Sequence, residues 1–209
     1  MKIGFHNSIE EISKNEWNSL LNDINYPFLK HDFLQLLENT NCVGAKTGWI
    51  PLHISVSKDN SLLAAMPLYL KSHSQGEFVF DHSWANAFYQ HGLDYYPKLV
   101  SSIPHTPASG PRFLIKEGEN KKELFEMIKE GVKSIAAKNN ISSWHILFPM
   151  EEEVDFYDDS NLSIRKNAQF TWFNKNFESF EDYISSFRAR HRKNAVSYTH
   201  LTLPTTVQV

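Results

Sequence analysis

The sequence predicts a mixed α/β fold in which helices cover both faces of a central sheet. Helical stripes and strand-like segments alternate along the chain after an early pair of helices. Residues 62–71 are almost entirely apolar, which is typical of a strand buried on both faces. The longest amphipathic stripe spans residues 120–139 and predicts a helix packed on the sheet.

The first seventy residues predict two helices followed by a hairpin. A capping-box spacing opens a helix over residues 13–24, and a second apolar stripe predicts a helix over residues 26–40. Alternating apolar and polar residues predict a strand over residues 52–57, and the turn at 58–61 joins it to the apolar strand. Because Pro67 donates no backbone hydrogen bond, we expect a bulge or splay at this point of that strand.

The middle of the chain predicts short elements and then the long helix. A short strand is expected to end at Asp81, and the aromatic-rich residues 81–98 predict a short helix with a loop. Two extended pieces around a Pro- and Gly-rich bend are expected over residues 97–115. Asn120 supplies the N-cap of the long helix.

The last third of the chain predicts a further strand, helix, strand and helix. Residues 142–149 form an apolar run typical of a buried strand, and residues 150–161 begin with acids that favour a helix N-terminus. A strand is expected over residues 163–174. Ser179 opens a final helix that continues into the basic residues 188–194.

Composition excludes several classes of protein. The 209 residues are 41% hydrophobic and 22% charged with a net charge of −3, which excludes disorder and a nucleic-acid binder that is basic over its whole surface. The single cysteine, Cys42, excludes an internal disulfide and a thiolate zinc cluster. No signal sequence or spanning segment is recognisable, so we expect a cytoplasmic protein.

Known catalytic signatures do not occur in the sequence. It contains no Walker loop, dinucleotide fingerprint, nucleophile elbow or H-E-x-x-H helix. The ten histidines lack the close spacing of a metal site, so no metal is predicted. Cys42 has no predictable base beside it and is interpreted as a small apolar residue rather than a nucleophile.

Residues 71–112 are the candidate binding region. Polar, aromatic and turn residues recur there at the ends of several adjacent predicted strands, where sites assemble on a rigid sheet. Tyr and Trp rings offer apolar walls with polar tips, and Lys, Arg, His and Asp side chains supply charge. The alternative is a loop-rich surface held down by its own aromatic residues.

Several motifs resemble a bacterial family of Fem-type proteins. These are "FLKHDFLQLLE", "VGAKTGWIPLHI", "MPLYLKSHSQGEFVFDHSWANAF", "GLDYYPKLVSSIPHTPASGPR" and "WHILFPMEEE". The resemblance runs in order from about Pro27 to Asn194 and implies a GNAT-like, acyl-CoA N-acyltransferase fold of two similar halves. We therefore expect a first GNAT-like domain over residues 1–176 and the opening basic helix of a truncated second one over residues 177–195. This fragment alone is then expected to be inactive.

Residues 196–209 differ in composition from the rest of the chain. They contain no Lys, Arg, Asp or Glu and are rich in Thr and Val. The string resembles the translated read-through of a sequencing adapter, so residues 196–209 are expected to be a non-native tail.

The basic helix is similar to the one that begins the second half of Fem-like proteins. Four cations, Arg188, Arg190, Arg192 and Lys193, lie within six residues of a net acidic chain and favour binding of phosphate or carboxylate groups. The alternatives are a solvated helix face and a nucleic-acid contact. GNAT enzymes that use coenzyme A usually carry a glycine-rich phosphate loop before the long helix, and "LIKEGENKKEL" at this place has one glycine, so the donor stays open between acyl-CoA, aminoacyl-tRNA and another activated acyl group.

The resemblance implies transfer of an acyl or aminoacyl group to an amine, in peptidoglycan-related metabolism. The reaction needs a proton acceptor, for which Asp81 and His73 are the candidates. The predicted acceptor-binding residues share ring faces or positive charge and are Lys71, Trp84, Tyr95, Tyr96, Lys98 and Arg112. The alternative is a non-catalytic protein of the same fold that recognises a cell-wall peptide or an anionic small molecule.

Overall fold

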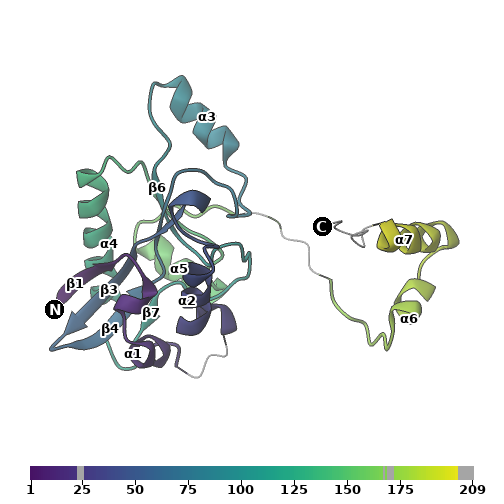
Figure 1. The fold of residues 1–209 in the computed structure, drawn as a ribbon, viewed down its shortest axis with the longest axis horizontal. Helices are drawn as coiled ribbons and strands as arrows, with labels where there is room; N and C mark the ends of the chain where they lie inside the picture. Colours follow the sequence, from purple (N-terminus) through teal and green to yellow (C-terminus); the bar gives the residue numbers. More distant parts are fainter. Residues whose placement is uncertain (23–25, 167, 169–171, 202–209) are drawn as a thin grey trace. The chain divides into compact units, whose positions relative to one another are not determined.

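The structure is a computed structural model that describes residues 1–22, 26–166, 168 and 172–201, with side chains through residue 197 (Figure 1). The chain divides into two compact units, Met1–Ile164 and Arg165–Val209. This division falls earlier in the chain than the one expected at residue 176. None of the helices among the described residues is both long enough and apolar enough to cross a membrane.

Unit 1 contains two four-stranded sheets. The first has the order β1-β3-β4-β7 and is antiparallel throughout. The second has the order β2-β5-β6-β8, in which only the β6–β8 pair is parallel. The strands are β1 (Lys2–His6), β2 (Trp49–Pro51), β3 (His53–Lys58), β4 (Ser61–Met66), β5 (Tyr69–Lys71), β6 (Lys98–Ser101), β7 (Leu114–Ile115) and β8 (Trp144–Ile146).

Seven α-helices occur among the described residues. They are α1 (Lys14–Ser19), α2 (His31–Asn39), α3 (His82–Gln90), α4 (Lys121–Lys138), α5 (Glu151–Asp159), α6 (Phe180–Ser185) and α7 (Ala189–Leu201). Short 3-10 turns span Ile9–Glu11, Pro27–Leu29 and Ala45–Thr47. Two predicted caps form, because Asn120 and Ser179 accept hydrogen bonds from the third residues of α4 and α6. The capping box predicted at Ser13 is wrong: the Ser13 side chain makes no cap hydrogen bond, and Glu16 accepts from the Leu62 N–H instead.

The predicted break at Pro67 is confirmed, and it separates the two sheets. The apolar run that follows the hairpin turn divides into β4 of the first sheet and β5 of the second. At the break, the Leu52 N–H donates to the Leu68 carbonyl at 2.9 Å, and the Leu68 N–H donates to His53 Nδ1 at 3.4 Å. A side chain therefore replaces a strand as the partner of this backbone group.

Helices cover the first sheet on both faces, as the sequence predicts. Leu63 and Met66 of β4 belong to a core shared with Phe125 of α4. Leu62 and Ala65 of the same strand belong to a second core, which α1 and α2 complete. Successive residues of a strand face opposite sides, so burial on both sides explains why the strand is almost wholly apolar. The α/β class is confirmed.

Two predicted strands are wrong in the described residues. Residues 72–81 contain no strand, because Phe78 has a positive φ of 57° and the chain turns to bury Glu77. The described residues of the range 163–174 also form no strand, and residues 167 and 169–171 lie outside the description.

Other predictions differ at the ends of elements. The first helix ends at Ser19 rather than Ile24, and the strands β1 and β2 were not predicted. Residues 196–201 of the expected non-native tail continue α7, and residues 202–209 lie outside the described residues.

Candidate functional site

Three neighbouring strands of the second sheet place one aromatic ring and two ammonium groups in a row. Trp49 of β2 pairs with Lys71 of β5, and Lys71 pairs with Lys98 of β6. Residues that pair directly across a sheet project from the same face, so the three side chains are neighbours. All three are fully buried, and the Lys71 Nζ lies 3.8 Å from the centre of the Trp49 ring. Two adjacent buried cations require compensating negative charge.

The loop between β5 and α3 supplies that charge. The Lys98 Nζ donates to Glu77 Oε2 at 2.8 Å and to Asp81 Oδ2 at 2.5 Å. The side chains of these two carboxylates are 1% and 3% exposed. A third bond, of 2.9 Å, joins the Lys98 Nζ to Ser74 Oγ. The three donor positions of the ammonium group are thus all used.

Asp81 is the centre of the cluster. Its Oδ2 also accepts from the Tyr95 hydroxyl at 2.7 Å and from the Ser74 hydroxyl at 2.9 Å. Burial alone would raise the pKa of Asp81, but the hydrogen bonds from Lys98, Tyr95 and Ser74 outweigh it and hold this pKa below its ordinary value. The Tyr96 hydroxyl lies 2.7 Å from Ser74 Oγ at the half-buried side of the cluster.

Two carboxylate oxygens in this cluster have no hydrogen-bond donor among the described residues. They are Asp81 Oδ1 and Glu77 Oε1, and both are buried. Burial raises the pKa of Glu77, and the attraction of Lys98 offsets this only in part. An unpaired buried carboxylate oxygen is costly, so the protein holds two strong acceptors ready for an N–H or O–H donor.

Lys71 is the less compensated of the two lysines. Its Nζ donates to the Gln75 carbonyl at 3.1 Å, and no carboxylate lies within ion-pair distance among the described residues. Burial, reinforced by the charge of Lys98 and opposed by Glu77, lowers the pKa of Lys71 to about 8. Part of the Lys71 population is therefore uncharged in mildly alkaline solution.

His73 lies beside this cluster but not in it. Its Nδ1 accepts from the Gln75 N–H at 3.2 Å, and its ring packs so closely on Gly48 that a Cβ there would lie 2.3 Å from Nε2. Gly48 also has a φ of +68°, so glycine is required twice over at this position. Burial and the charge of Lys71 lower the pKa of His73.

Arg112 is buried at a separate position. Its guanidinium donates to the carbonyl groups of Leu147 at 2.7 Å, Ala108 at 2.6 Å and Pro111 at 3.3 Å. Burial lowers the pKa of Arg112 to about 10. These bonds fasten the bend before β7 to the segment that follows β8.

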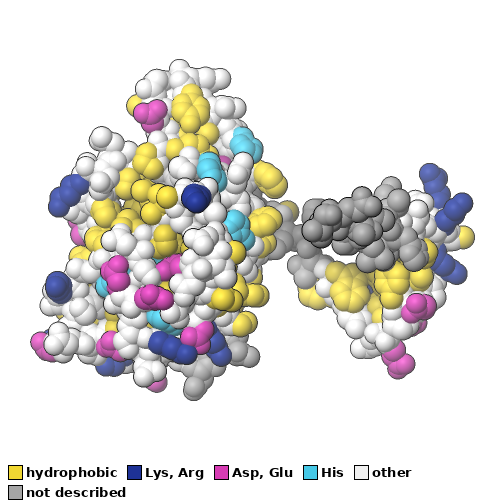
Figure 2. All heavy atoms as spheres, in the orientation of Figure 1, with side chains coloured by type: hydrophobic (Ala, Val, Ile, Leu, Met, Phe, Trp, Pro, Cys, Tyr) yellow, Lys and Arg dark blue, Asp and Glu magenta, His cyan; other side chains and the backbone are white. Residues whose placement is uncertain are grey.

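The remaining predicted binding residues are exposed side chains of α3 and of unit 2. Trp84 is on α3 and 46% exposed. Arg188, Arg190, Arg192 and Lys193 are exposed residues of unit 2, where Figure 2 shows the blue side chains of α7 at the surface. Arg192 Nη2 donates to the carbonyl groups of Ser185 and Phe187 at 3.2 Å. Anion binding by these residues stays a prediction.

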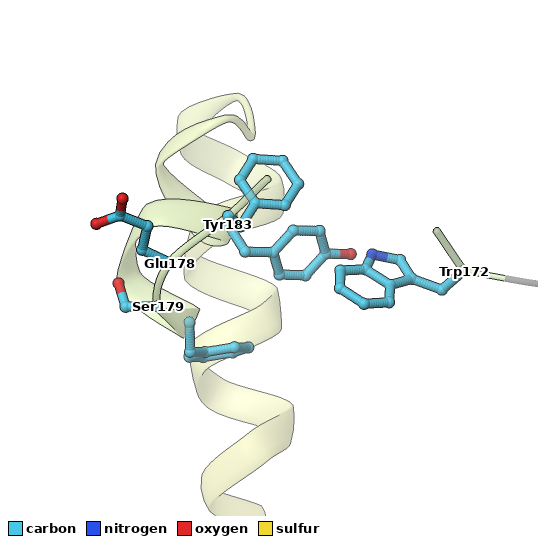
Figure 3. Close-up of a pocket in the computed structure, with 6 residues that line it drawn as sticks. Trp172, Glu178, Ser179 and Tyr183 are labelled. Carbon is cyan, nitrogen blue, oxygen red and sulfur yellow. The ribbon is translucent and has the colours of Figure 1, made fainter. Parts of the chain in front are cut away.

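The charge cluster lines neither of two hollows found in the described residues. One of about 360 Å³ lies in unit 2, where Trp172 and Tyr183 point toward one another in Figure 3. Its lining is Trp172, Phe177, Glu178, Ser179, Phe180 and Tyr183. The other, of about 410 Å³, lies between α4, the start of β8 and the residues after α5. No three metal-binding side chains gather in the described part of the chain.

Five residues in or beside the cluster were predicted from the sequence, and three were not. Lys71, Lys98, Asp81, Tyr95 and Tyr96 were predicted and lie in or beside it. Glu77, Ser74 and Trp49 were not singled out. Glu77 was assigned to a strand, and an acidic residue in an apolar run such as "GEFVF" is the signal that favours a buried partner.

Comparison with known proteins gives the family. No curated protein matches the chain. Solved structures with a similar fold include the aminoglycoside 6'-N-acetyltransferase AAC(6')-Ig of Acinetobacter haemolyticus, which is 10% identical with a TM-score of 0.47 over 85% of this chain and 100% of that one. A ribosomal-protein-alanine N-acetyltransferase of Brucella melitensis biovar Abortus is 11% identical with a TM-score of 0.49 over 82% and 98%.

The family model for FemAB-like proteins, described as peptidoglycan biosynthesis/recognition, matches residues 8–197. That range covers most of both units, without β1 and the end of α7, and it includes every residue of the charge cluster. The chain therefore belongs to the FemAB-like family.

Proposed function

We propose that this protein transfers an acyl group from an activated ester or thioester to an amine, in peptidoglycan-related metabolism. Membership of the FemAB-like family supports this setting. The observation that carries the proposal is the pair of buried carboxylate oxygens, Asp81 Oδ1 and Glu77 Oε1, that have no donor. An amine nitrogen is a donor of the kind that either oxygen requires.

The reaction joins the amine nitrogen to the acyl carbonyl carbon. A neutral amine attacks this carbon, the new C–N bond forms, and the C–O or C–S bond of the donor breaks. The amine loses a proton to a carboxylate, and the departing oxygen or sulfur takes up a proton. Asp81 and His73 remain the proposed bases, and we add Glu77 because its raised pKa makes it a stronger base than Asp81.

The cations of the cluster have a matching part in the proposal. Negative charge develops on the acyl oxygen during attack. The ammonium group of Lys71, whose one hydrogen bond among the described residues goes to the Gln75 carbonyl, would donate to this oxygen in surroundings of low polarity. Lys98 would add only its positive charge, because its three donor positions are used within the cluster. The acceptor would enter past Ser74 and Tyr96, which are half-buried. Tyr95 and Trp84 are proposed to hold the acceptor. Arg112 is proposed to position the bend around the acceptor, because the guanidinium N–H groups of Arg112 already donate to carbonyl groups.

The test is acyl transfer by the purified protein. It is incubated with thioester donors and a panel of primary amines, and the mass of each amine is followed. Glu77→Gln and Asp81→Asn keep side-chain volume and are expected to lower the rate by about 100-fold or more. Glu130→Gln, an exposed change on α4, is the matched control and is expected to leave the rate unchanged.

Retention of the fold is measured for each variant by its unfolding midpoint in urea. Acyl transfer that is equally fast in wild type, Glu77→Gln and Asp81→Asn would exclude the cluster from the chemistry. If the protein binds one of the amines but increases the mass of none of them, the second candidate below is supported.

The second candidate is binding without turnover. The observation that favours it is the internal saturation of Lys98, whose three hydrogen bonds all go to protein groups. A protein of this kind would use the two vacant oxygens to recognise a cationic or amide group of a cell-wall peptide. Calorimetric titration with such a peptide, in the absence of a donor, measures this binding directly.

The donor and the compartment complete the proposal. A thioester donor agrees with the exposed cations Arg188, Arg190 and Lys193, which we propose to contact its anionic groups. A cytoplasmic location is supported by the free, exposed thiol of Cys42.

A further inference from the structure

The surface around α3 combines exposed apolar side chains with few charged ones: the exposed Asp94 lies at its edge, and Asp81 at its base is buried. Residues 82–93 contain no Lys, Arg, Asp or Glu, in a chain that is 22% charged. Five large apolar side chains between residues 78 and 93 are about half or more exposed: Phe78 55%, Phe80 79%, Trp84 46%, Tyr89 53% and Leu93 57%. Such a patch is unusual on the surface of a protein and marks a site of interaction.

The apolar face of α3 is only partly covered by unit 1. Trp84, Ala85, Phe88 and Tyr89 share one face of the helix, at spacings of one, four and five residues. Ala85 is buried, and the Phe88 ring packs on Tyr95 with ring centres 5.1 Å apart. Trp84 and Tyr89, on the two flanks of this face, remain exposed. Tertiary packing therefore leaves these two side chains about half exposed.

The segment is convex and firmly anchored. Figure 1 shows α3 standing out from the rest of unit 1, and no other helix or strand of the described residues packs extensively against it. Figure 2 shows hydrophobic side chains at the surface of this part. At its base, Asp81 is held by Lys98 and Tyr95, so the helix is presented on a fixed support.

We propose that α3 and its flanking residues dock into the interfacial layer of an electrically neutral lipid membrane. A convex apolar tip penetrates a soft interface without a complementary groove, and Trp and Tyr rings suit the boundary between acyl chains and headgroups. The absence of Lys and Arg from residues 82–93 favours zwitterionic over anionic lipid. With nine residues, α3 is too short to span a bilayer and lies in its surface.

Phosphatidylcholine vesicles test this inference, which does not depend on the proposed function. The intact chain is floated with the vesicles and its partition coefficient is measured. The combined variant Phe80→Ser, Tyr89→Ser and Leu93→Ser is expected to partition at least about tenfold more weakly. The matched variant Leu36→Ser, Phe173→Ser and Phe180→Ser removes apolar residues of similar exposure elsewhere and is expected to stay within about twofold of wild type.

Salt and self-association separate the remaining explanations. Binding through α3 is expected to change by less than about twofold when salt rises to about 0.5 M, because the patch is uncharged. A steep loss of binding with salt would assign it to the basic residues of unit 2 and overturn the proposal. Equal partitioning of the two triple variants into the vesicles would also overturn the proposal. Failure of wild type to bind vesicles, with a dimer that the α3 variant abolishes, would identify the patch as an interface between two copies.

Discussion

Lys98 shows how strongly one buried cation depends on its surroundings. Removing a buried charge from water costs several kcal/mol, and only well-placed partners repay it. Lys98 has Glu77, Asp81 and Ser74 within 2.9 Å, and its position on β6 is set by the sheet. The cost of losing it should therefore far exceed that of an exposed lysine.

Lys98→Met is expected to lower the free energy of unfolding by about 3–5 kcal/mol, because it leaves two carboxylates buried without a cation. Urea denaturation measures this loss. Lys133→Met is the control, since Lys133 and Glu130 form an ion pair of 2.7 Å in which both side chains are 65% exposed. Its cost should be much smaller, because water already screens an exposed ion pair. Equal losses in the two variants would mean that the cluster adds nothing specific.

Arg112 is expected to tolerate no replacement by lysine. The guanidinium donates in three directions to fixed carbonyl groups, and an ammonium group on a flexible stem cannot reproduce that fork. Arg112→Lys should therefore cost about 2–3 kcal/mol of unfolding free energy. Arg190→Lys, at an exposed position, should cost less than about 0.5 kcal/mol. A loss below about 1 kcal/mol for Arg112→Lys would contradict the structural role.

At the residue scale, the sequence identifies the charged side chains of the cluster better than it identifies their partners. Lys71, Lys98 and Asp81 stood out because charge is rare in apolar or aromatic surroundings. Their convergence depends on the register of β5 with β6, in which Lys71 pairs with Lys98. Register is decided by contacts between distant segments, and no local pattern encodes it.

The elements themselves follow local patterns where those patterns are long. Helix α4 and the β3–β4 hairpin agree with prediction because capping, periodicity and turn residues all favour the same structure. The segment before Asp81 differs, because the buried bonds of Glu77 and Asp81 with Lys98 override its apolar, strand-like composition. Strand β1 was missed since only five residues form it, and its partner β3 lies far along the chain.

Glu38 is where three elements are joined, and it makes the fold sensitive to acid. On α2, its carboxylate accepts from the Ser8 hydroxyl at 2.6 Å, the Ile9 N–H at 3.0 Å and His53 Nε2 of β3 at 3.1 Å. Burial raises the pKa of Glu38, but the hydrogen bonds from His53, Ser8 and Ile9 together lower it below its ordinary value.

A carboxyl group whose pKa is lower in the folded state stabilises the fold above its unfolded pKa, here 4.5, and loses this effect as pH falls through the folded value. Glu38→Gln should therefore cost about 1–3 kcal/mol at pH 7 and make unfolding free energy less dependent on pH below about 5. Urea titrations across this pH range measure both effects. If the unfolding free energy of Glu38→Gln falls with decreasing pH as steeply as that of wild type, the acid sensitivity belongs to another carboxylate, such as Asp81.

At the scale of the whole molecule, the stabilising cores belong to unit 1. The three groups of buried apolar residues all lie between residues 9 and 157. The described residues of unit 2 contribute an aromatic group centred on Tyr183, in which Phe180 remains 47% exposed. Because a domain is defined by a core of its own, unit 1 should fold without unit 2.

A chain that ends at Ile164 tests this independence. Its unfolding free energy and the steepness of its urea transition should match those of unit 1 in the full chain to within about 1 kcal/mol. Phosphate or thioester binding, if it resides in Arg188, Arg190 and Lys193, should be lost at the same time. A shortened chain that unfolds several kcal/mol more easily would show that the units are coupled, because only lost contacts with residues 165–209 would then account for the difference.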